Sequence, residues 1–144
     1  MRTLEHNHAV QFMQWWALSC KRYGVDERLL FAIPNGGKRH IAVARKMKAE
    51  GVRAGVSDYF LAVPRNGFHG LFIELKAGDG LGIKKGQLSE AQIQFGQMVR
   101  EQGYDFTVAR GFGNAMGSVQ MYLRFDHVMC LTRPVPIVGV TVEP

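Results

Sequence analysis

The amino-acid sequence predicts an α/β layer fold, in which a central mixed β-sheet is flanked by α-helices. Apolar segments of strand length alternate with segments of helical periodicity, and clusters of Pro, Asn and Gly separate them. The 144 residues contain no internal repeat and no linker, so we expect a single domain over residues 1–144. The expected order is helix, strand, basic helix, two strands, helix, strand, helix.

The first expected helix covers residues 3–23 and ends at Gly24, which suits a helix C-terminus because glycine tolerates positive φ. Four apolar residues recur at spacings of three, four and three, which predicts the buried face of this helix: Val10, Met13, Ala17 and Cys20. A short strand of buried type follows over residues 29–33 and stops at the breaker cluster 34–37.

A run of basic residues coincides with the next expected helix, residues 38–50. Six of the eighteen basic residues lie between positions 38 and 53, where Glu50 is the only acid: Lys38, Arg39, Arg45, Lys46, Lys48 and Arg53. On a helix, the first four share one face, opposite Ala44 and Met47. The run is interpreted either as a solvated surface or as a track for a phosphate backbone, and a track would make binding strongly salt-dependent.

Two adjacent strands are expected next, over residues 59–63 and 70–77. The Asn66-Gly67 pair between them tolerates positive φ and favours a hairpin-like reversal of the chain. Both strands carry apolar runs, typical of strands covered on both sides, where a lone charge costs several kcal/mol. Charged side chains there need a partner or a chemical role.

Three such charged residues are Asp58, Glu74 and Lys76. Side chains alternate along a strand, so Glu74 and Lys76 emerge on one face, and the reversal brings Asp58 close to Glu74. Two neighbouring carboxylates repel unless one is protonated or a cation lies between them, and oxygen ligands favour Mg²⁺ or Mn²⁺. We therefore predict a metal site, with Lys76 placed to position or help deprotonate a bound water.

A third helix is expected to begin at the N-cap Ser89 and to end at Gly103. One face of this helix is formed by Leu88, Gln92, Phe95 and Val99. Gln92 therefore points inward, and a buried amide must find hydrogen-bond partners. It is interpreted either as a tie between helix and sheet or as a residue that orients a carboxylate, water or phosphate.

The C-terminal third is predicted to contain a strand over residues 105–109 and a helix over residues 112–129, which Gly113 and Gly117 weaken. The apolar tail, residues 134–142, contains prolines that keep it out of a helix. We expect this tail to be an edge strand or a partner-binding arm.

The glycine-rich segment 78–86 is interpreted as a mobile loop. Lys84 and Lys85 lie in it, and we expect them to close over a bound nucleic-acid strand. The segment matches neither a complete Rossmann fingerprint nor a Walker A motif, so a dinucleotide- or phosphate-binding enzyme has little support.

Composition excludes several classes of protein. No apolar run has the length of a membrane span, and the N-terminus lacks the pattern of a signal peptide, so we expect a cytoplasmic protein without a membrane partner. Cys20 and Cys130 are far apart and have no zinc-type spacing, which favours two free buried thiols.

Five blocks in order, over roughly residues 30–110, resemble the VRR-NUC (virus-type replication-repair nuclease) family of the PD-(D/E)xK nuclease superfamily. The blocks are Pro34-Asn35-Gly36-Gly37, then Lys48-x-x-Gly51-Val52-x-x-Gly55-Val56-x-Asp58, then Glu74-Leu75-Lys76, then Ser89-x-x-Gln92, then Gly103-Tyr104. Asp, about fifteen residues, then Glu-x-Lys is a weak pattern by itself, and the five blocks together are a strong one. Ser57 stands where the family usually has proline, a change that concerns the backbone and not the chemistry.

The resemblance implies a restriction-endonuclease-like fold and a metal-dependent endodeoxyribonuclease. It implies that Asp58, Glu74 and the backbone carbonyl of Leu75 hold Mg²⁺ or Mn²⁺, with Lys76 and Gln92 completing the catalytic site. Glu5 is a further ligand by resemblance, or a first-turn acid favoured by the helix dipole. Small stand-alone members look like homodimers that cut branched DNA such as four-way (Holliday) junctions, and family habit indicates a viral or mobile-element origin.

Two alternatives remain from the sequence alone. The first is a basic DNA-binding module that keeps this fold without catalysis, against which the intact acids and lysine argue. The second is a nuclease that acts on other DNA structures, such as flaps, ends or plain duplex.

Overall fold

The computed structural model describes residues 2–34, 40–78 and 86–124. The helices are α1 (Arg2–Ser19), α2 (Ile41–Ala49), α3 (Glu90–Glu101) and α4 (Phe112–Arg124), and the 3₁₀ turns are η1 (Cys20–Tyr23) and η2 (Glu27–Leu29). The strands are β1 (Leu30–Ala32), β2 (Tyr59–Leu61), β3 (Leu71–Lys76) and β4 (Asp105–Arg110). The predicted order of elements is confirmed.

The four strands form one mixed sheet in the order β1-β2-β3-β4. β2 is antiparallel to both β1 and β3, whereas β4 is parallel to β3. The β2–β3 connection makes the predicted reversal, with φ of 53° at Asn66 and 81° at Gly67, as a type I′ turn requires. Arg65 and Phe68 close this turn by two backbone hydrogen bonds of 3.1 and 2.8 Å.

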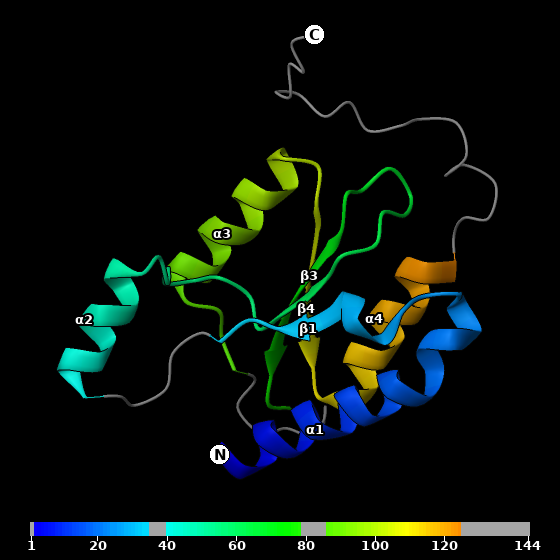
Figure 1. Ribbon diagram of the computed structural model, residues 1–144, viewed down its shortest axis with the longest axis horizontal. Helices are drawn as coiled ribbons and strands as arrows, with labels where there is room; N and C mark the ends of the chain where they lie inside the picture. Colours follow the sequence, from blue (N-terminus) through cyan, green and yellow to red (C-terminus); the bar gives the residue numbers. More distant parts are fainter. Residues whose placement is uncertain (1, 35–39, 79–85, 125–144) are drawn as a thin grey trace, which may run out of the picture.

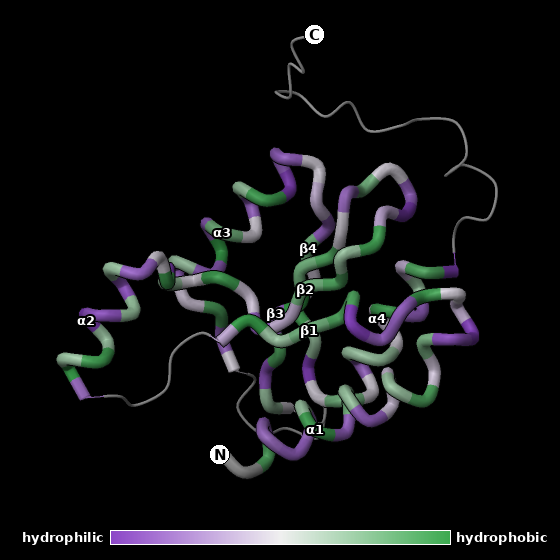
Figure 2. Tube along the Cα trace, in the orientation of Figure 1, coloured by the Kyte–Doolittle hydropathy of each residue, from purple (hydrophilic) through white to green (hydrophobic). Residues whose placement is uncertain are grey.

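Helices cover both faces of the sheet. α1 and α4 lie together on one face, and α3 lies on the other (Figure 1). Leu71, Ile73 and Leu75 of β3 point to the α1/α4 side and are at most 2% exposed, so this side holds the main core. Hydrophilic and hydrophobic residues alternate along the helices, as expected for helices with one buried side (Figure 2).

The buried face of α1 differs from the predicted one. Phe12 and Trp16 are fully buried with Cys20, while Val10 is 41% exposed and Ala17 is exposed. The two aromatic side chains bury more apolar area than Val10 and Ala17, so they determine which side of the helix faces the core. Gly24 has φ of 67° and caps η1, so the predicted stop is confirmed.

α2 is shorter than predicted. It begins at Ile41 instead of residue 38. Lys38 and Arg39, which were predicted to lie on its basic face, are outside the described residues. None of the residues of α2, all of which are described, is buried. Figure 1 shows α2 beyond the end of the sheet at which β1 ends and β2 begins.

The predicted stretch 112–129 is helical as far as Arg124, where the description stops, so the apolar tail and Cys130 lie outside the described residues. Cys20 is a free, buried cysteine, as expected. Within the described ranges, no helix combines the length and apolar character that a membrane crossing requires.

Candidate active site

The two predicted acids lie opposite each other at one end of the sheet. Tyr59 pairs with Ile73, and continuing this register by one residue places Asp58 opposite Glu74. Asp58 Oδ2 accepts a hydrogen bond of 2.7 Å from the N–H of Leu75. Because the N–H and C=O of a strand residue point to the same side, the carbonyl of Leu75 also faces Asp58.

Glu74 is a buried carboxylate, with 2% of the residue exposed. Its Oε1 accepts from Lys76 Nζ at 2.9 Å and from the side-chain amide of Gln92. Its Oε2 is buried and has no hydrogen-bond partner within the part of the chain that the structure describes. An unpaired buried carboxylate oxygen is costly, so this atom is suited to a ligand that supplies positive charge.

The pKa values of both carboxyls are raised, first by burial and then by neighbouring negative charge. Burial raises the pKa of Glu74 from 4.5 to about 7; the hydrogen bond from Lys76 opposes this rise, and the charges of Asp58 and Glu5 add to it. Burial also raises the pKa of Asp58, against the effects of the Leu75 N–H and of Lys76. A cation between the two carboxylates would relieve this repulsion.

Gln92 connects the helix α3 to the carboxylate and the lysine. Ser89 and Gln92 form a capping box, in which Gln92 Oε1 accepts from the Ser89 N–H at 2.9 Å. The same oxygen accepts from Lys76 Nζ at 3.1 Å, while the amide nitrogen donates to Glu74. One side chain therefore ties the helix to the sheet and also orients two candidate site residues. The two interpretations of Gln92 from the sequence are thus compatible with each other.

The donor set fits a divalent cation, although it is small. Among the described residues, no group of three or more His, Cys, Asp and Glu side chains could hold a metal. The chain offers instead two carboxylates and the Leu75 carbonyl, with the unpaired Glu74 Oε2 among them. Hard oxygen donors with negative charge suit Mg²⁺ or Mn²⁺, which keep several waters in proteins.

Glu5 lies near this donor set without joining it. It is exposed on the first turns of α1, and its charge raises the pKa values of both Asp58 and Glu74.

The described basic residues of the predicted track lie on and just after α2. Arg45, Lys46, Lys48 and Arg53 are all exposed, and Lys46 pairs with Glu50 at 3.8 Å. Arg53 folds back to the carbonyl of Lys48 at 3.4 Å. The other four predicted basic residues lie outside the described residues: Lys38, Arg39, Lys84 and Lys85.

The structure adds Arg110, which the sequence interpretation missed. Arg110 pairs in register with Lys76, and its guanidinium donates to the carbonyl of Gly86 at 2.7 Å. The predicted strand ended at residue 109, one residue too early. If the predicted strand is continued by one residue, from 109 to 110, and paired with the strand that carries Glu74 and Lys76, Arg110 comes to lie next to Lys76.

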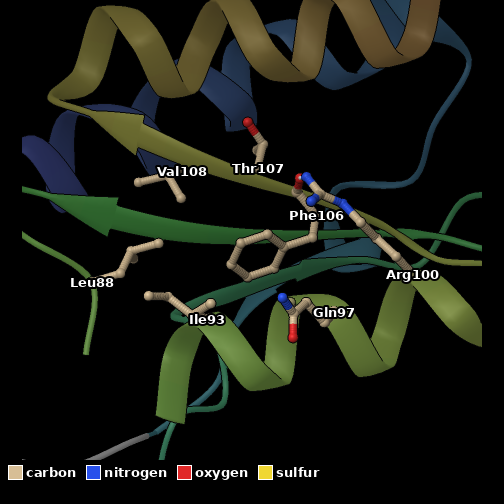
Figure 3. Close-up of a pocket in the computed structure, with 8 residues that line it drawn as sticks. Leu88, Ile93, Gln97, Arg100, Phe106, Thr107 and Val108 are labelled. Carbon is tan, nitrogen blue, oxygen red and sulfur yellow. The ribbon is translucent and has the colours of Figure 1, made fainter. Parts of the chain in front are cut away.

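Two hollows on the surface lie apart from the carboxylates. One, of about 320 Å³, lies between α3 and β4 (Figure 3). There Arg100 donates to the carbonyl of Phe106 at 2.7 Å and lies 5.5 Å from the centre of its ring. The other, of about 530 Å³, runs along α1 and reaches Tyr59. Neither is lined by a predicted site residue.

Known proteins resemble this chain in family and in fold. The model of the VRR-NUC domain matches residues 1–113. The chain belongs to the VRR-NUC family. The predicted family is therefore confirmed, and VRR-NUC is a nuclease-type family whose members act on DNA and generally use divalent metals.

A solved structure described as a VRR_NUC domain protein resembles this VRR-NUC chain. The two are 26% identical with a TM-score of 0.68, over 85% of this chain and 93% of the other. This similarity confirms the predicted mixed α/β fold. No match was found among curated proteins.

Proposed function

We propose that this VRR-NUC chain is a metal-dependent endonuclease that hydrolyses phosphodiester bonds in DNA. The observation that carries the proposal is the buried carboxylate of Glu74, which faces Asp58 and is hydrogen-bonded to Lys76. One of its oxygens has no hydrogen-bond partner among residues 2–34, 40–78 and 86–124. A structural acid in a core would have both oxygens paired. A carboxylate with an unpaired oxygen beside a second acid fits a ligand site better.

Asp58, Glu74 and the carbonyl of Leu75 would hold Mg²⁺ or Mn²⁺. Such an ion supplies Lewis acidity toward a phosphate oxygen and a nucleophilic water at neutral pH. Glu74 binds a cation in its ionised form, so the raised pKa of this carboxyl couples ion binding to loss of a proton near pH 7.

Lys76 would act on the reacting phosphate. Its Nζ is held by Glu74 Oε1 at 2.9 Å and by Gln92 Oε1 at 3.1 Å, so the ammonium has a fixed direction and one remaining donor. A fixed positive donor stabilises negative charge that develops on phosphate oxygens, or orients the attacking water. Gln92 positions both Glu74 and Lys76, and Glu5 adds an acid near the same place.

DNA would approach the site along α2. This helix and the segment after it carry four exposed cations: Arg45, Lys46, Lys48 and Arg53. Four further predicted DNA contacts lie outside the described residues: Lys38, Arg39, Lys84 and Lys85. The net charge of +6 favours a polyanionic partner. Binding should weaken steeply as salt rises, because cations on the protein displace counterions from DNA.

From the family resemblance we infer more specific features of the activity. The chain would act as a single domain over residues 1–144, in the cytoplasm, as a homodimer that cuts branched DNA such as four-way junctions. In such a homodimer, two-fold symmetry would present two identical sites to two strands.

Cleavage of an end-labelled four-way junction, beside a matched linear duplex, tests the proposal. Wild type should nick the junction with Mn²⁺ and not with chelator, while Asp58→Ala should abolish nicking and leave binding. Asp26→Ala is the matched control, because Asp26 is an exposed acid that pairs with Arg28 and lies away from the end of the sheet that carries Asp58. Binding without cutting would refute catalysis and support the DNA-binding module, whereas equal cutting of both DNAs would refute the junction preference alone.

A further inference from the structure

A row of four phenylalanines crosses the sheet on the face that carries α3. Phe31, Phe60, Phe72 and Phe106 are direct cross-strand partners, one from each strand in order. Directly paired residues of neighbouring strands project from the same face, so the four side chains form one band, in which the rings of Phe31, Phe60 and Phe72 pack in succession. The Phe60 and Phe72 rings are 4.5 Å apart between centroids.

α3 covers one end of this band. Phe95 packs edge-to-face on Phe72 at 5.2 Å, and Gly96 lets the helix approach Phe106, since a Cβ there would lie 2.8 Å from the ring. Figure 3 shows the Phe106 ring directed toward Ile93 and Gln97 of α3. The β3 and β4 end of the band is therefore part of the packed interior.

The β1 end of the band is open. Phe31 is 44% exposed, and its ring stands at 74° to that of Phe60, 5.9 Å away. The sequence pattern predicted a buried strand here, and this prediction was wrong for Phe31. β1 is an edge strand with α3 at the opposite edge of the sheet, so Phe31 keeps an aromatic surface in contact with solvent.

This open end adjoins the candidate active site. Asp58 and Phe60 are two residues apart on one face, which in a strand is about 7 Å. The N–H of Ile33 donates to the carbonyl of Asp58 at 2.7 Å, so β1 and β2 stay side by side up to the row of the acids. Phe31 therefore stands one row of side chains from the carboxylates, on the same face.

Charge near this place favours a nucleic acid over a protein or lipid partner. The basic helix α2 stands beyond the same end of the sheet (Figure 1), with exposed Arg45, Lys46 and Lys48. An exposed ring one row from the candidate active site, with a basic helix beyond the same end of the sheet, matches the way proteins hold single strands, with cations on the backbone and aromatic rings on the bases. A base within a duplex has both faces covered by its neighbours, so only an unstacked base can reach such a ring.

We propose that Phe31, supported by Phe60, is a stacking platform for the base of an unpaired nucleotide next to the phosphodiester that is cut. The platform rests on the proposed nuclease function and narrows its substrate class to DNA in which a nucleotide is unpaired at the site or can leave its base pair there, as at the branch point of a junction. Fully paired duplex lacks the ligand of this platform.

The test is a fluorescence titration of the full chain, with chelator present so that no cutting occurs. The probe is a duplex with one bulged 2-aminopurine, compared with the same duplex fully paired. Wild type should bind the bulged probe more tightly and quench its fluorescence, because stacking on an aromatic ring quenches this base. Phe31→Leu should weaken binding of the bulged probe about tenfold, which is about 1.4 kcal/mol, and change the paired probe by less than about twofold.

Two control variants sharpen this test. Phe31→Trp keeps an aromatic face and should retain both tight binding and quenching. Leu18→Ala removes an 88% exposed apolar side chain from α1, away from the band, and should change neither probe. Thermal melts of each variant establish that it is folded.

Any of three binding results would overturn the platform: wild type does not prefer the bulged probe, Phe31→Leu has no effect, or Phe31→Leu weakens binding of both probes equally. A fourth such result comes from the sedimentation of the free protein. If Phe31→Leu changes its oligomeric state, Phe31 belongs to a protein contact. The outcomes separate the two proposals. A protein that cuts with Mn²⁺ but shows no preference for the bulge overturns the platform alone. A protein that prefers the bulge but never cuts overturns the nuclease alone.

Discussion

Replacing Glu74 with glutamine should stabilise the metal-free protein at pH 8 while removing its response to divalent cations. Glutamine has the shape of the protonated acid, and its oxygen can still accept from Lys76 and Gln92. The substitution therefore removes the buried negative charge without removing the packing. In most proteins, loss of a buried, ion-paired acid destabilises the fold, so the sign of this effect is diagnostic.

The magnitude follows from the pKa of Glu74. This pKa rises from 4.5 to about 7 on folding, and each pH unit corresponds to about 1.4 kcal/mol, so the full effect is about 3 kcal/mol. The folded state holds the proton more tightly than the unfolded state. The stabilisation that comes from protonated Glu74 is therefore fully present below pH 4.5 and is lost as the pH rises through 7. Glu74→Gln should differ little from wild type at pH 5 and exceed it by about 3 kcal/mol at pH 8.

Urea titrations with chelator, followed by the fluorescence of Trp15 and Trp16, would measure the free energy of unfolding at both pH values. Glu101→Gln, at an exposed position of α3, removes the same charge from the surface and serves as the control. Adding Mg²⁺ should raise the melting temperature of wild type at pH 8, less so at pH 6, and not that of Glu74→Gln. The reasoning fails if Glu74→Gln is less stable than wild type at pH 8, or if the difference is the same at pH 5.

Three further predictions concern the core and the site. Gly55→Ala should lower the free energy of unfolding by about 1–3 kcal/mol more than Gly67→Ala. Both glycines have positive φ, but of the two only Gly55 leaves no room for a Cβ, which would lie 2.4 Å from the carbonyl oxygen of Ala91. Urea titrations that give the reverse order would contradict this. Trp16→Ala should cost about 3–5 kcal/mol in a thermal melt, since the side chain is fully buried and its Nε1 donates to a backbone carbonyl at 2.8 Å, and a loss below about 1 kcal/mol would show that the site can collapse. Gln92→Ala should slow cleavage by about 10- to 100-fold and leave the Kd for DNA nearly unchanged, because it positions catalytic groups without touching the DNA track; parallel losses in rate and affinity would disprove that division.

The closeness of the two acids could be predicted because it depends on local features. Alternation along β3 sets the face of Glu74, and the Asn66-Gly67 reversal brings β2 back beside β3. The exact pairing could not be predicted, because the turn pair Arg65–Phe68 and the strand pair Tyr59–Ile73 differ in register by one residue. The inward direction of Gln92 followed equally from helical spacing and the Ser89 cap.

Other features depend on the assembled sheet and could not be read from the sequence. The spacing of Val10, Met13 and Ala17 fits a buried helix face as well as the true one does, and only packing against the sheet selects Phe12 and Trp16. The exposure of Phe31 depends on β1 being an edge strand, which is a property of strand order and not of the strand's own residues. The neighbourhood of Arg110 and Lys76 likewise arises from a parallel pairing between segments more than thirty residues apart.

The absence of buried side chains on α2, all of whose nine residues are described, has a consequence for turnover. Helices shorter than about 12–15 residues are marginal in water unless tertiary packing supports them. We expect α2 to fray in the free protein and to become fully helical on DNA, so part of the binding energy is spent on ordering the backbone. The charges of such a helix favour binding of the substrate, whereas the backbone entropy that the helix regains favours release of the cut product. The two effects oppose each other at every turnover.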